Sequence, residues 1–399
     1  MHRAAYDYVA AHAGQPASVI EIGSRDLNGS VRPLFPGATY VGLDVVDGPG
    51  VDVVFDPAVP PPVRVRSEVV VCCEVLEHVA DWPDVLAMAA RYLRADGRLI
   101  VTAAGPGRRP HSGITGRRTL EPGEHYENID PRLLAVELER AGFIDIEVDV
   151  AGCDVRAHAR RRVRTVVGIP FIDETDRTAE VIEAVLADPA VDVLFLADNG
   201  STDPRLLEYL DRVILSPRVV LNRGPALEAG GSLYALWNEV VRTAQAIEPG
   251  DPVNVALLNN DVRFLPGTIE ALADALRSSP SEVAAVYPDW NRRLTDGHDV
   301  AGLTVTSGAW SKGGLSGFAF LFAGELMGPV IPYFDERYRL IHGDGDFVED
   351  LEAAGLTAAR VDGLPLEHDK STTLNAQREW TGPVKAEDTL RRKAKVATR

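Results

Sequence analysis

Apolar residues in the first part of the chain fall into short runs that are separated by helical segments. Five of these runs predict strands, at residues 17–23, 40–44, 51–56, 69–73 and 98–102. Residues 82–93 place apolar side chains at helical spacing and are followed by Gly97, which predicts that the helix ends there. A further helix and strand are predicted over residues 133–141 and 143–150. Strands that alternate with helices predict a parallel sheet with right-handed crossovers.

The same alternation starts again near residue 165. Strands are predicted at residues 165–171, 193–197, 219–221 and 255–258, and helices around residues 181–186 and 229–244. The basic run at residues 156–164 predicts a solvated linker in preference to a patch for an acidic partner. We therefore expect an α/β protein with two domains, at residues 1–155 and 165–378. Residues 379–399 are basic and poor in apolar side chains, which predicts a mobile tail.

Composition limits the partners and the compartment. The net charge of −18 over 399 residues argues against a nucleic-acid partner, because phosphate contacts need Lys and Arg. No apolar run approaches the roughly 18 residues of a membrane span, and the N-terminal segment lacks a signal-peptide core. The three cysteines, Cys72, Cys73 and Cys153, are too few for a disulfide framework and are predicted to be packing residues. We expect a soluble cytoplasmic enzyme, and its oligomeric state stays open.

A glycine and an acidic residue mark a nucleoside site in the first domain. The first predicted strand ends at Gly23, and Asp44 ends the second strand about 20 residues later. At this spacing an acidic side chain can bind a ribose diol while the glycine turn lets the rest of the ligand approach the backbone. The turn at residues 23–30 is not G-x-G-x-x-G. A nucleoside without phosphates is therefore favoured over a dinucleotide.

Four segments of the first domain resemble successive motifs of the class I S-adenosylmethionine-dependent methyltransferases. They are EIGSRD at residues 21–26, GLD at 42–44, CEVLEHV at 73–79 and LRADGRL at 93–99. The resemblance implies a Rossmann-like methyltransferase sheet with S-adenosylmethionine as the cofactor. It implies that Glu21 and Gly23 border the methionine part, that Asp44 binds the ribose hydroxyls and that Asp56 lies near the adenine. Ser24 and Glu74 complete the cofactor-binding set that we expect.

Three histidines are candidates for the acceptor side of this domain. His78 follows the fourth predicted strand, and an imidazole near pH 7 suits the removal of a proton from an acceptor hydroxyl. His78 could equally be a capping or structural residue. His111 and His125 belong to the segment 105–125, which is rich in Gly, Pro and Arg and is expected to be an acceptor-side loop.

An apolar run in the second domain ends abruptly in three polar residues, Asn259, Asn260 and Asp261. The carboxyl end of a buried parallel strand usually opens into the ligand crevice. In an extended segment Asn259 and Asp261 point to the same side. Two hard oxygens on one side suit Mg²⁺ or Mn²⁺ bound to a diphosphate. The alternative is a strand that ends in turn-forming residues without a ligand.

The second domain resembles the nucleotide-sugar half of GT-A glycosyltransferases, specifically the inverting family 2. The matching segments are IPF at residues 169–171, DNGSTD at 198–203, NRG at 222–224, LNND at 258–261, FDERY at 334–338 and HGDGDFVEDL at 342–351. The resemblance implies a GT-A (nucleotide-diphospho-sugar transferase) mixed sheet, a UDP-, GDP- or dTDP-linked sugar donor and a divalent metal. Two departures are a metal segment with one carboxylate and Gly343 before the base, where the family has Glu.

The same resemblance implies a role for each matching residue. The expected donor-binding residues are Pro170, Asp173, Glu174, Asp198, Asn222 and Asn260. The expected metal ligands are Asn259, Asp261 and His368. Asp344 aligns with the catalytic base, and Asp346 is the second choice. Aromatic residues among glycines, namely Trp310, Phe318, Phe320 and Phe322, suit a sugar acceptor, although part of that run also predicts a core strand.

Together these features predict a bifunctional glycan-modifying enzyme. The second domain would transfer a sugar to an acceptor hydroxyl with inversion, and the first would O-methylate the sugar or glycan. The acceptor stays open between a glycan, a lipid-linked glycan, a small metabolite and a protein. The alternative is a glycosyltransferase whose methyltransferase-like domain serves only as a binding or scaffolding module.

Overall fold

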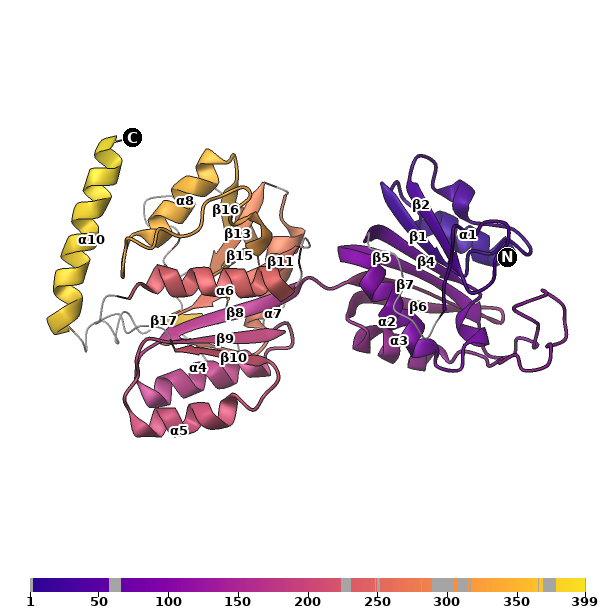
Figure 1. Ribbon diagram of the computed structural model, residues 1–399, viewed down its shortest axis with the longest axis horizontal. Coiled ribbons are helices and arrows are strands. Elements are labelled where there is room, and N and C mark those ends of the chain that lie inside the picture. The colour runs from indigo at the N-terminus through magenta and orange to yellow at the C-terminus, as the bar shows by residue number, and fades with distance from the viewer. Residues whose placement is uncertain are drawn as a thin grey trace. The chain divides into compact units, whose positions relative to one another are not determined.

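A computed structural model describes most of the chain as two compact units, Met1–Val163 and Arg164–Arg399 (Figure 1). The described residues are 3–56, 66–223, 231–247, 249, 252–280, 282–288, 304–307, 315, 317–364, 366–368 and 378–398. Each unit has a mixed sheet covered by helices. The predicted α/β class with two sheet domains is therefore confirmed.

The sheet of the N-terminal unit has the strand order β3-β2-β1-β4-β5-β7-β6. The first five strands in this order are parallel, and β7 runs antiparallel between β5 and β6. The carboxyl ends of the parallel strands therefore share one edge, where ligands bind in such sheets. The bounds are β1 Ser18–Ile22, β2 Thr39–Asp44, β3 Val53–Val54, β4 Ser67–Cys73, β5 Leu93–Ala104, β6 Phe143–Ala151 and β7 Asp154–Arg161.

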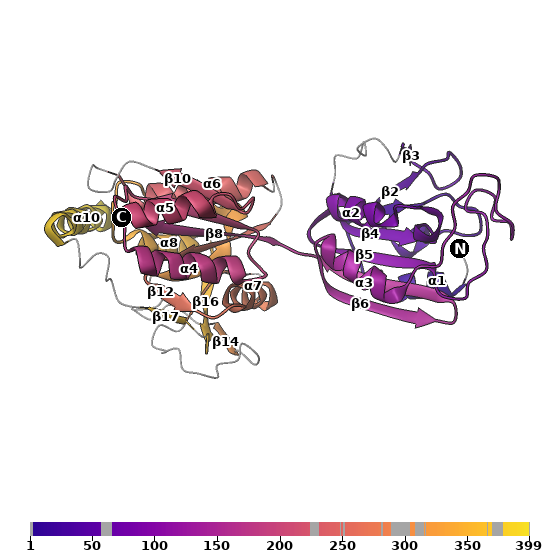
Figure 2. The same ribbon diagram turned by 90° about the horizontal axis from the view of Figure 1, so that it is seen from below.

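Helices cover both faces of this sheet (Figures 1 and 2). Helix α1 (Arg3–His12) packs on one face, and α2 (Trp82–Tyr92) and α3 (Pro131–Arg140) pack on the other. Residues 69–73 of β4 are all apolar because their side chains alternate between the two cores, with Val69 and Val71 toward α1 and Val70 and Cys72 toward α2 and α3.

The predicted linker at residues 156–164 is wrong, because most of it is β7 inside the sheet. Its residues alternate between the core and the surface. Val155, Ala157 and Ala159 are buried, whereas Arg156 and Arg160 pair with acids, as in the 2.9 Å bond from Arg156 Nε to Asp149 Oδ1 on β6. The charge of the run concealed a period of two that is typical of a strand with one buried face.

The sheet of the C-terminal unit has the order β10-β9-β8-β11-β15-β13-β16-β14. Strands β10, β9, β8 and β11 are parallel, and β15 is antiparallel to β11 and β13. A separate ladder joins β12 (Val262–Phe264) to β17 (Leu366–His368). The other bounds are β8 Arg164–Phe171, β9 Val193–Asp198, β10 Val219–Arg223, β11 Val253–Leu258, β13 Val283–Pro288, β14 Thr304–Ser307, β15 Ala319–Ala323 and β16 Thr357–Asp362.

Helices also cover both faces of this second sheet (Figure 1). One core contains residues from α4 (Thr175–Ala187), α5 (Pro204–Val213) and α7 (Thr268–Ser278). The other contains residues from α6 (Leu233–Ile247) and α8 (Gly343–Ala353), and it is aromatic. There the ring of Trp237 lies 5.1 Å from that of Phe334 and 5.5 Å from that of Phe320.

The predicted mobile tail is also wrong, because residues 378–398 form the helix α10 (Arg378–Thr398). A buried acid holds it in place. Asp388 is fully buried and accepts the backbone N–H groups of Arg339, Leu340 and Ile341 at 2.8 to 3.1 Å. Although α10 is long, no helix in the described part of the chain is apolar enough to cross a membrane.

Replacing Asp388 with Asn should loosen α10. An amide oxygen in the Oδ2 position can still accept all three N–H groups, but it carries no charge, and the amide nitrogen would then face the N–H of Arg339. The three bonds should therefore weaken by about 1–3 kcal/mol in total. We expect faster hydrogen exchange and earlier protease cleavage within α10 in the full chain. The exposed neighbour Glu387 provides the matched control as Glu387→Gln. Equal exchange of α10 in both variants would show that Asp388 does not anchor the helix.

Candidate functional site

The glycine turn of the N-terminal unit packs against the segment that follows β4. Gly23 has a φ of 78°, and a Cβ built there would lie 2.1 Å from Val75 Cγ2. The N–H groups of Gly23 and Ser24 both donate to the carbonyl of Leu43, at 2.8 and 3.0 Å. Only glycine satisfies both the backbone angle and the close approach. The turn therefore joins the ends of β1, β2 and β4.

Glu21 lies at this edge but has a partner inside the unit. It is 3% exposed, and its Oε2 accepts a 2.7 Å hydrogen bond from the hydroxyl of Tyr40. Burial raises the pKa of Glu21 to about 7, although the Tyr40 bond acts in the opposite direction. The side chain can therefore be neutral or charged near physiological pH.

Asp44, which we expect to bind a ribose diol, lies at the end of β2. Its two oxygens accept the N–H groups of Arg25 and Val46, both at 3.0 Å, and the side chain is only half-buried. Each carboxylate oxygen has a second lone pair that a hydroxyl can use. Ser24, in the neighbouring turn, is 2% exposed. Asp56 is exposed, and the stretch 57–65 after it lies outside the described residues.

Glu74 begins the segment after β4 in a left-handed conformation, with a φ of 57°. Its Oε1 accepts a hydrogen bond from Thr102 Oγ1 at 3.1 Å, and its Oε2 lies 3.4 Å from Arg108 Nη2. A non-glycine residue in this region is strained by roughly 1–2 kcal/mol. Such strain clusters at functional sites, although Asp96 and Asp145 of this chain also have a positive φ. The carboxylate of Glu74 is thus held by two neighbours at the ligand edge.

His78 belongs to a group of polar side chains beyond β4. Glu77, His78 and His111 offer ligand atoms that lie within 4.8 Å of one another. The ring of Tyr126 packs edge-on against both imidazoles, at 5.6 Å from His78 and 5.3 Å from His111. His125 lies 3.7 Å from Glu127 instead. The loop thus brings His111, but not the side chain of His125, to the group around His78.

Burial sets the protonation of this group. It lowers the pKa of His78, and the nearby His111 lowers it further, so the His78 ring is neutral at pH 7 and can accept a proton. Glu77 has no exposed surface, and its burial, with Glu74 nearby, raises its pKa to about 8. Sequence reasoning assigned no role to Glu77, because the side chain's burial depends on packing that the motif does not reveal.

In the C-terminal unit, the buried Asp261 pairs with the partly buried His368. Asp261 Oδ1 lies 3.2 Å from His368 Nε2, and the ladder of β12 and β17 places Val262 opposite His368. The ring of Phe318 stacks on that of His368, with centroids 4.5 Å apart. Two expected metal ligands, separated by more than 100 residues in the sequence, therefore meet.

The expected geometry of Asn259 is wrong. Strand β11 ends at Leu258, and Asn260 and Asp261 form a turn, so the alternation of an extended strand does not apply. The backbone N–H of Asn259 donates to the carbonyl of Phe318 at 2.8 Å. The neighbouring Asn260, expected to bind the donor, is 5% exposed and donates to Thr178 Oγ1 on α4 at 3.0 Å. It is therefore part of the packing against α4.

The other expected donor-binding residues lie at the ends of β8, β9 and β10. Asp198 is 2% exposed and accepts the N–H groups of Gly200 and Ser201, at 3.1 and 2.8 Å. Asp173 accepts the N–H groups of Thr202 and Asp203, at 2.7 and 2.9 Å, so both acids shape the same loop. The remaining members are the buried Pro170 and the half-buried Glu174 and Asn222.

Asp344 and Asp346 have different surroundings at the start of α8. Asp344 is half-buried, and its Oδ2 accepts the N–H of Gly317 at 3.0 Å. Asp346 is 2% exposed and forms ion pairs with Arg392 and Lys395 of α10. A buried carboxylate that already faces two cations is a poor base. The prediction of Asp346 as the second-choice base is therefore wrong, whereas Asp344 stays the candidate base.

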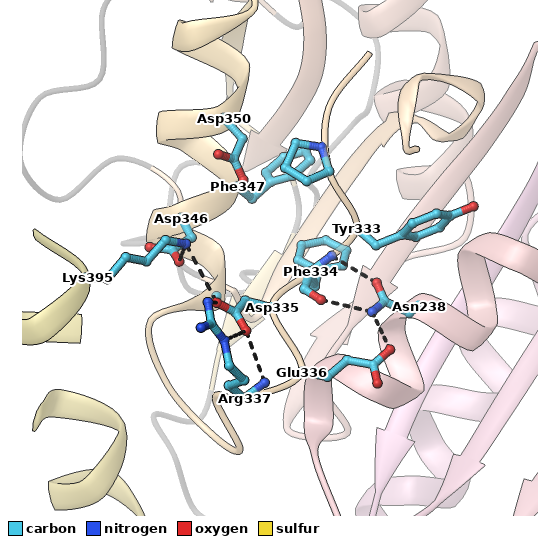
Figure 3. A pocket seen from close by; sticks show the side chains of 12 residues that line it. Asn238, Tyr333, Phe334, Asp335, Glu336, Arg337, Asp346, Phe347, Asp350 and Lys395 are labelled. Carbon is cyan, nitrogen blue, oxygen red and sulfur yellow. Dashed lines mark hydrogen bonds and ion pairs between the residues drawn. The ribbon is translucent and has the colours of Figure 1, made fainter. Parts of the chain in front are cut away.

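A pocket of about 450 Å³ lies beside α8 (Figure 3). Asn238 of α6 organises one wall, since it donates to the carbonyl of Phe334 at 3.0 Å and to Glu336 Oε1 at 2.8 Å. On the opposite side Lys395 reaches Asp346. Sequence reasoning missed this pocket, because α10 was expected to be mobile.

The aromatic run expected to face a sugar acceptor is mostly core. Phe318, Phe320 and Phe322 are at most 3% exposed, and the last two pack in the aromatic core with Trp237 and Phe347. Trp310 lies outside the described residues. The interpretation as an acceptor surface is therefore wrong for the three phenylalanines.

Comparison with known proteins finds a similarity for the N-terminal unit. Residues 2–148 match the family model described as "Methyltransferase domain". This match lies within the N-terminal unit, Met1–Val163, and covers most of it. No curated protein matches the chain.

Solved structures resemble parts of the chain at low identity. One is 1,6-didemethyltoxoflavin-N1-methyltransferase of Burkholderia thailandensis, at 21% identity and a TM-score of 0.31, covering 40% of this chain and 77% of that one. Another is the N-terminal domain of EvdMO1, at 20% identity and a TM-score of 0.32, covering 40% and 84%. A third is S. aureus TarS 1-349, at 12% identity and a TM-score of 0.38, covering 56% and 65%.

Replacing Glu21 with Gln should change how stability depends on pH. The pKa of Glu21 is about 7 in the folded state and ordinarily 4.5, the value expected in the unfolded chain. Between these pH values the folded state therefore binds one more proton than the unfolded state. Stability is therefore lost as pH rises from about 4.5 to about 7, by roughly 3 kcal/mol in total. Gln cannot ionise but can still accept the Tyr40 bond.

We expect Glu21→Gln to melt like the parent near pH 4.5 and several degrees higher at pH 8. Melting curves across this range, with the exposed Glu139→Gln as the control, measure the difference. A constant difference between parent and Glu21→Gln at all pH values would contradict the raised pKa.

Proposed function

We propose that the chain is a bifunctional glycan-modifying enzyme. The N-terminal unit transfers a methyl group from S-adenosylmethionine to a hydroxyl. The C-terminal unit transfers a sugar, with inversion, from a nucleotide donor to an acceptor hydroxyl. One observation carries the glycosyl half: the consecutive residues Gly317 and Phe318 contact Asp344 and His368 respectively. The candidate base and the candidate metal pair thus border one short segment.

For methyl transfer, the family match supports the reaction class, and the ligand edge supports the cofactor. Asp44 has oxygens available for the ribose, and Gly23 allows the methionine part to approach the backbone. A hydroxyl attacks the methyl carbon, the bond from carbon to sulfur breaks, and S-adenosylhomocysteine leaves. The hydroxyl proton must also go, and His78, whose burial lowers its pKa and keeps the imidazole neutral at pH 7, would take it.

For glycosyl transfer, the pair of Asp261 and His368 would hold a divalent ion on the donor diphosphate. Carboxylate oxygen and imidazole nitrogen together fit Mn²⁺ better than Mg²⁺, which prefers oxygen alone. Such an ion would offset the charge that develops on the leaving group. Asp344 would take the proton of the acceptor hydroxyl as its oxygen bonds to the anomeric carbon from the opposite side.

A second candidate function is glycosyl transfer alone, with the N-terminal unit as a binding or scaffolding module. The observation that favours it is the turn at residues 23–30, which departs from the usual glycine pattern. The two readings differ in one measurable property, because a module without a cofactor site binds no S-adenosylmethionine.

Asp44→Ala should weaken the binding of S-adenosylmethionine. At about 100 times the dissociation constant the cofactor should stabilise the parent by about 2.7 kcal/mol, which a thermal-shift assay detects. We expect this shift to disappear in Asp44→Ala and to persist in Asp47→Ala, which changes an exposed acid in the same loop. If S-adenosylmethionine does not raise the melting temperature of the parent, the result supports the second candidate function, in which the N-terminal unit is a binding or scaffolding module.

Asp344→Asn should abolish glycosyl transfer while nucleotide binding persists. Loss of a general base commonly lowers the rate by about 10²–10⁴-fold. The substrate screen uses UDP-, GDP- and dTDP-sugars with Mn²⁺, and binding of each diphosphate is measured by calorimetry. Glu352→Gln, an exposed change on the same helix, serves as the control.

In the same screen Asp261→Asn should lose the effect of Mn²⁺ on diphosphate binding. If the parent transfers sugar and Asp344→Asn is equally active, Asp344 is not the base. If Asp261→Asn responds to Mn²⁺ as the parent does, the ion is held elsewhere.

A further inference from the structure

We propose that Glu77, His78 and His111 form a binding site for a divalent transition-metal ion in the N-terminal unit. Their ligand atoms come from the segment after β4 and from the loop after β5, and they lie within 4.8 Å of one another. This site is separate from Asp261 and His368, which belong to the other unit.

Glu77 supplies the strongest argument for a cation. The side chain has no exposed surface, and neither carboxylate oxygen has a hydrogen-bond partner. The backbone amides of Glu77 itself and Ala104 favour its charged form but do not reach hydrogen-bond geometry. A buried carboxylate is expensive unless it takes up a proton, is paired or coordinates a metal, and a bound cation is the alternative to protonation for Glu77. Two imidazoles offer ligand atoms within 4.8 Å of it, while the charges of Glu74 and Arg108 act on it from nearby with opposite signs.

The imidazoles are available as ligands. Nδ1 of His78 is buried without a hydrogen-bond partner, although nitrogen atoms in this state normally find one. A neutral imidazole has one nitrogen with a free lone pair, which is the form that binds a metal. His111 is half-buried, so the group is closed on the side of Glu77 and more open on the side of the loop.

The loop that carries His111 is held in place without any ion. Glu124 Oε1 accepts bonds from Ser112 Oγ at 2.8 Å and from the N–H of Ile114 at 3.0 Å. A Cβ at Gly113 would lie 2.9 Å from the ring of His78, so the backbone packs directly on the imidazole. The site is thus largely formed in advance, which favours binding.

The ligand set and its size suit a transition metal. Bonds of about 2.1 Å to a tetrahedral ion place ligand atoms roughly 3.4 Å apart, so modest side-chain rotations would close the present separation. Two histidines and one carboxylate that leave coordination positions open are typical of Zn²⁺, Fe²⁺ and related ions. Mg²⁺ and Ca²⁺ prefer all-oxygen sites and fit less well.

The location gives the ion a task that rests on the proposed methyl transfer. Val75, two residues before Glu77, touches the glycine turn expected to hold the cofactor. An open coordination position there would bind the acceptor hydroxyl and ease the loss of its proton to solvent. The oxygen then takes the methyl carbon as the carbon–sulfur bond breaks. In this arrangement His78 would be a metal ligand and not the base, and the ion would activate the hydroxyl.

Cobalt binding to the full, untagged chain tests the site. The parent for this test carries Asp261→Ala and His368→Ala, which remove the candidate ligands of the other unit. After treatment with a chelator, Co²⁺ is titrated and followed by its visible absorption and by calorimetry. We expect one bound equivalent, and affinity at least about tenfold weaker in His78→Ala, His111→Ala and Glu77→Gln. His125→Ala, a histidine of the same loop, should bind as the parent does.

Two outcomes would overturn the proposal. One is a folded parent that binds no Co²⁺, and the other is unchanged affinity in the His78→Ala, His111→Ala double variant. If the variants fail to fold, the histidines of the parent are modified with diethyl pyrocarbonate in the presence and absence of Co²⁺. We then expect Co²⁺ to protect His78 and His111, and absence of protection would contradict the site. Neither measurement uses cofactor or acceptor. Absence of metal binding therefore does not contradict the proposed methyl transfer, and absence of methyl transfer does not contradict the metal site.

Discussion

A carboxylate that folding removes from water must be surrounded by donors or cations, and this constraint shapes both units. Asp388 is fully buried and accepts three backbone N–H groups, which is why α10 docks at its position. Asp198 uses two N–H groups in the same way to fold the loop after β9. Asp346 is compensated by Arg392 and Lys395. Because breaking any of these arrangements exposes an unpaired buried charge, the surrounding backbone is fixed with them.

The same constraint separates structural acids from functional ones. Acids that already have their donors, such as Asp346, have little capacity left for a ligand. Asp44 and Asp344 are half-buried and keep lone pairs free at the ligand edges. Glu77 is the exception, since it is buried without a partner. Its surroundings make sense if a cation completes them, and two imidazoles are in place to share that cation.

Each unit uses its sheet to the same end. Parallel strands bring their carboxyl ends to one edge, so short loops from distant parts of the sequence meet there. In the N-terminal unit this edge joins the turns after β1, β2 and β4. In the C-terminal unit the ladder of β12 and β17 adds His368 to the turn after β11. The two reactions that we propose thus use loops on similar scaffolds, which differ in how the antiparallel strands complete each sheet.

The sequence by itself determined the features that depend on local pattern: the strands that lead up to Gly23, Asp44 and Asn259, the amphipathic helices, the α/β class and the segments that carry the candidate ligands. Only the tertiary structure decided which of those ligands have partners already. It turned the basic run at residues 156–164 into β7, docked α10, paired Asp346 with Lys395 and buried Glu77 beside His111. Periodicity and turn chemistry act between near neighbours, whereas burial and charge compensation depend on residues far apart in the sequence, and only folding brings those together.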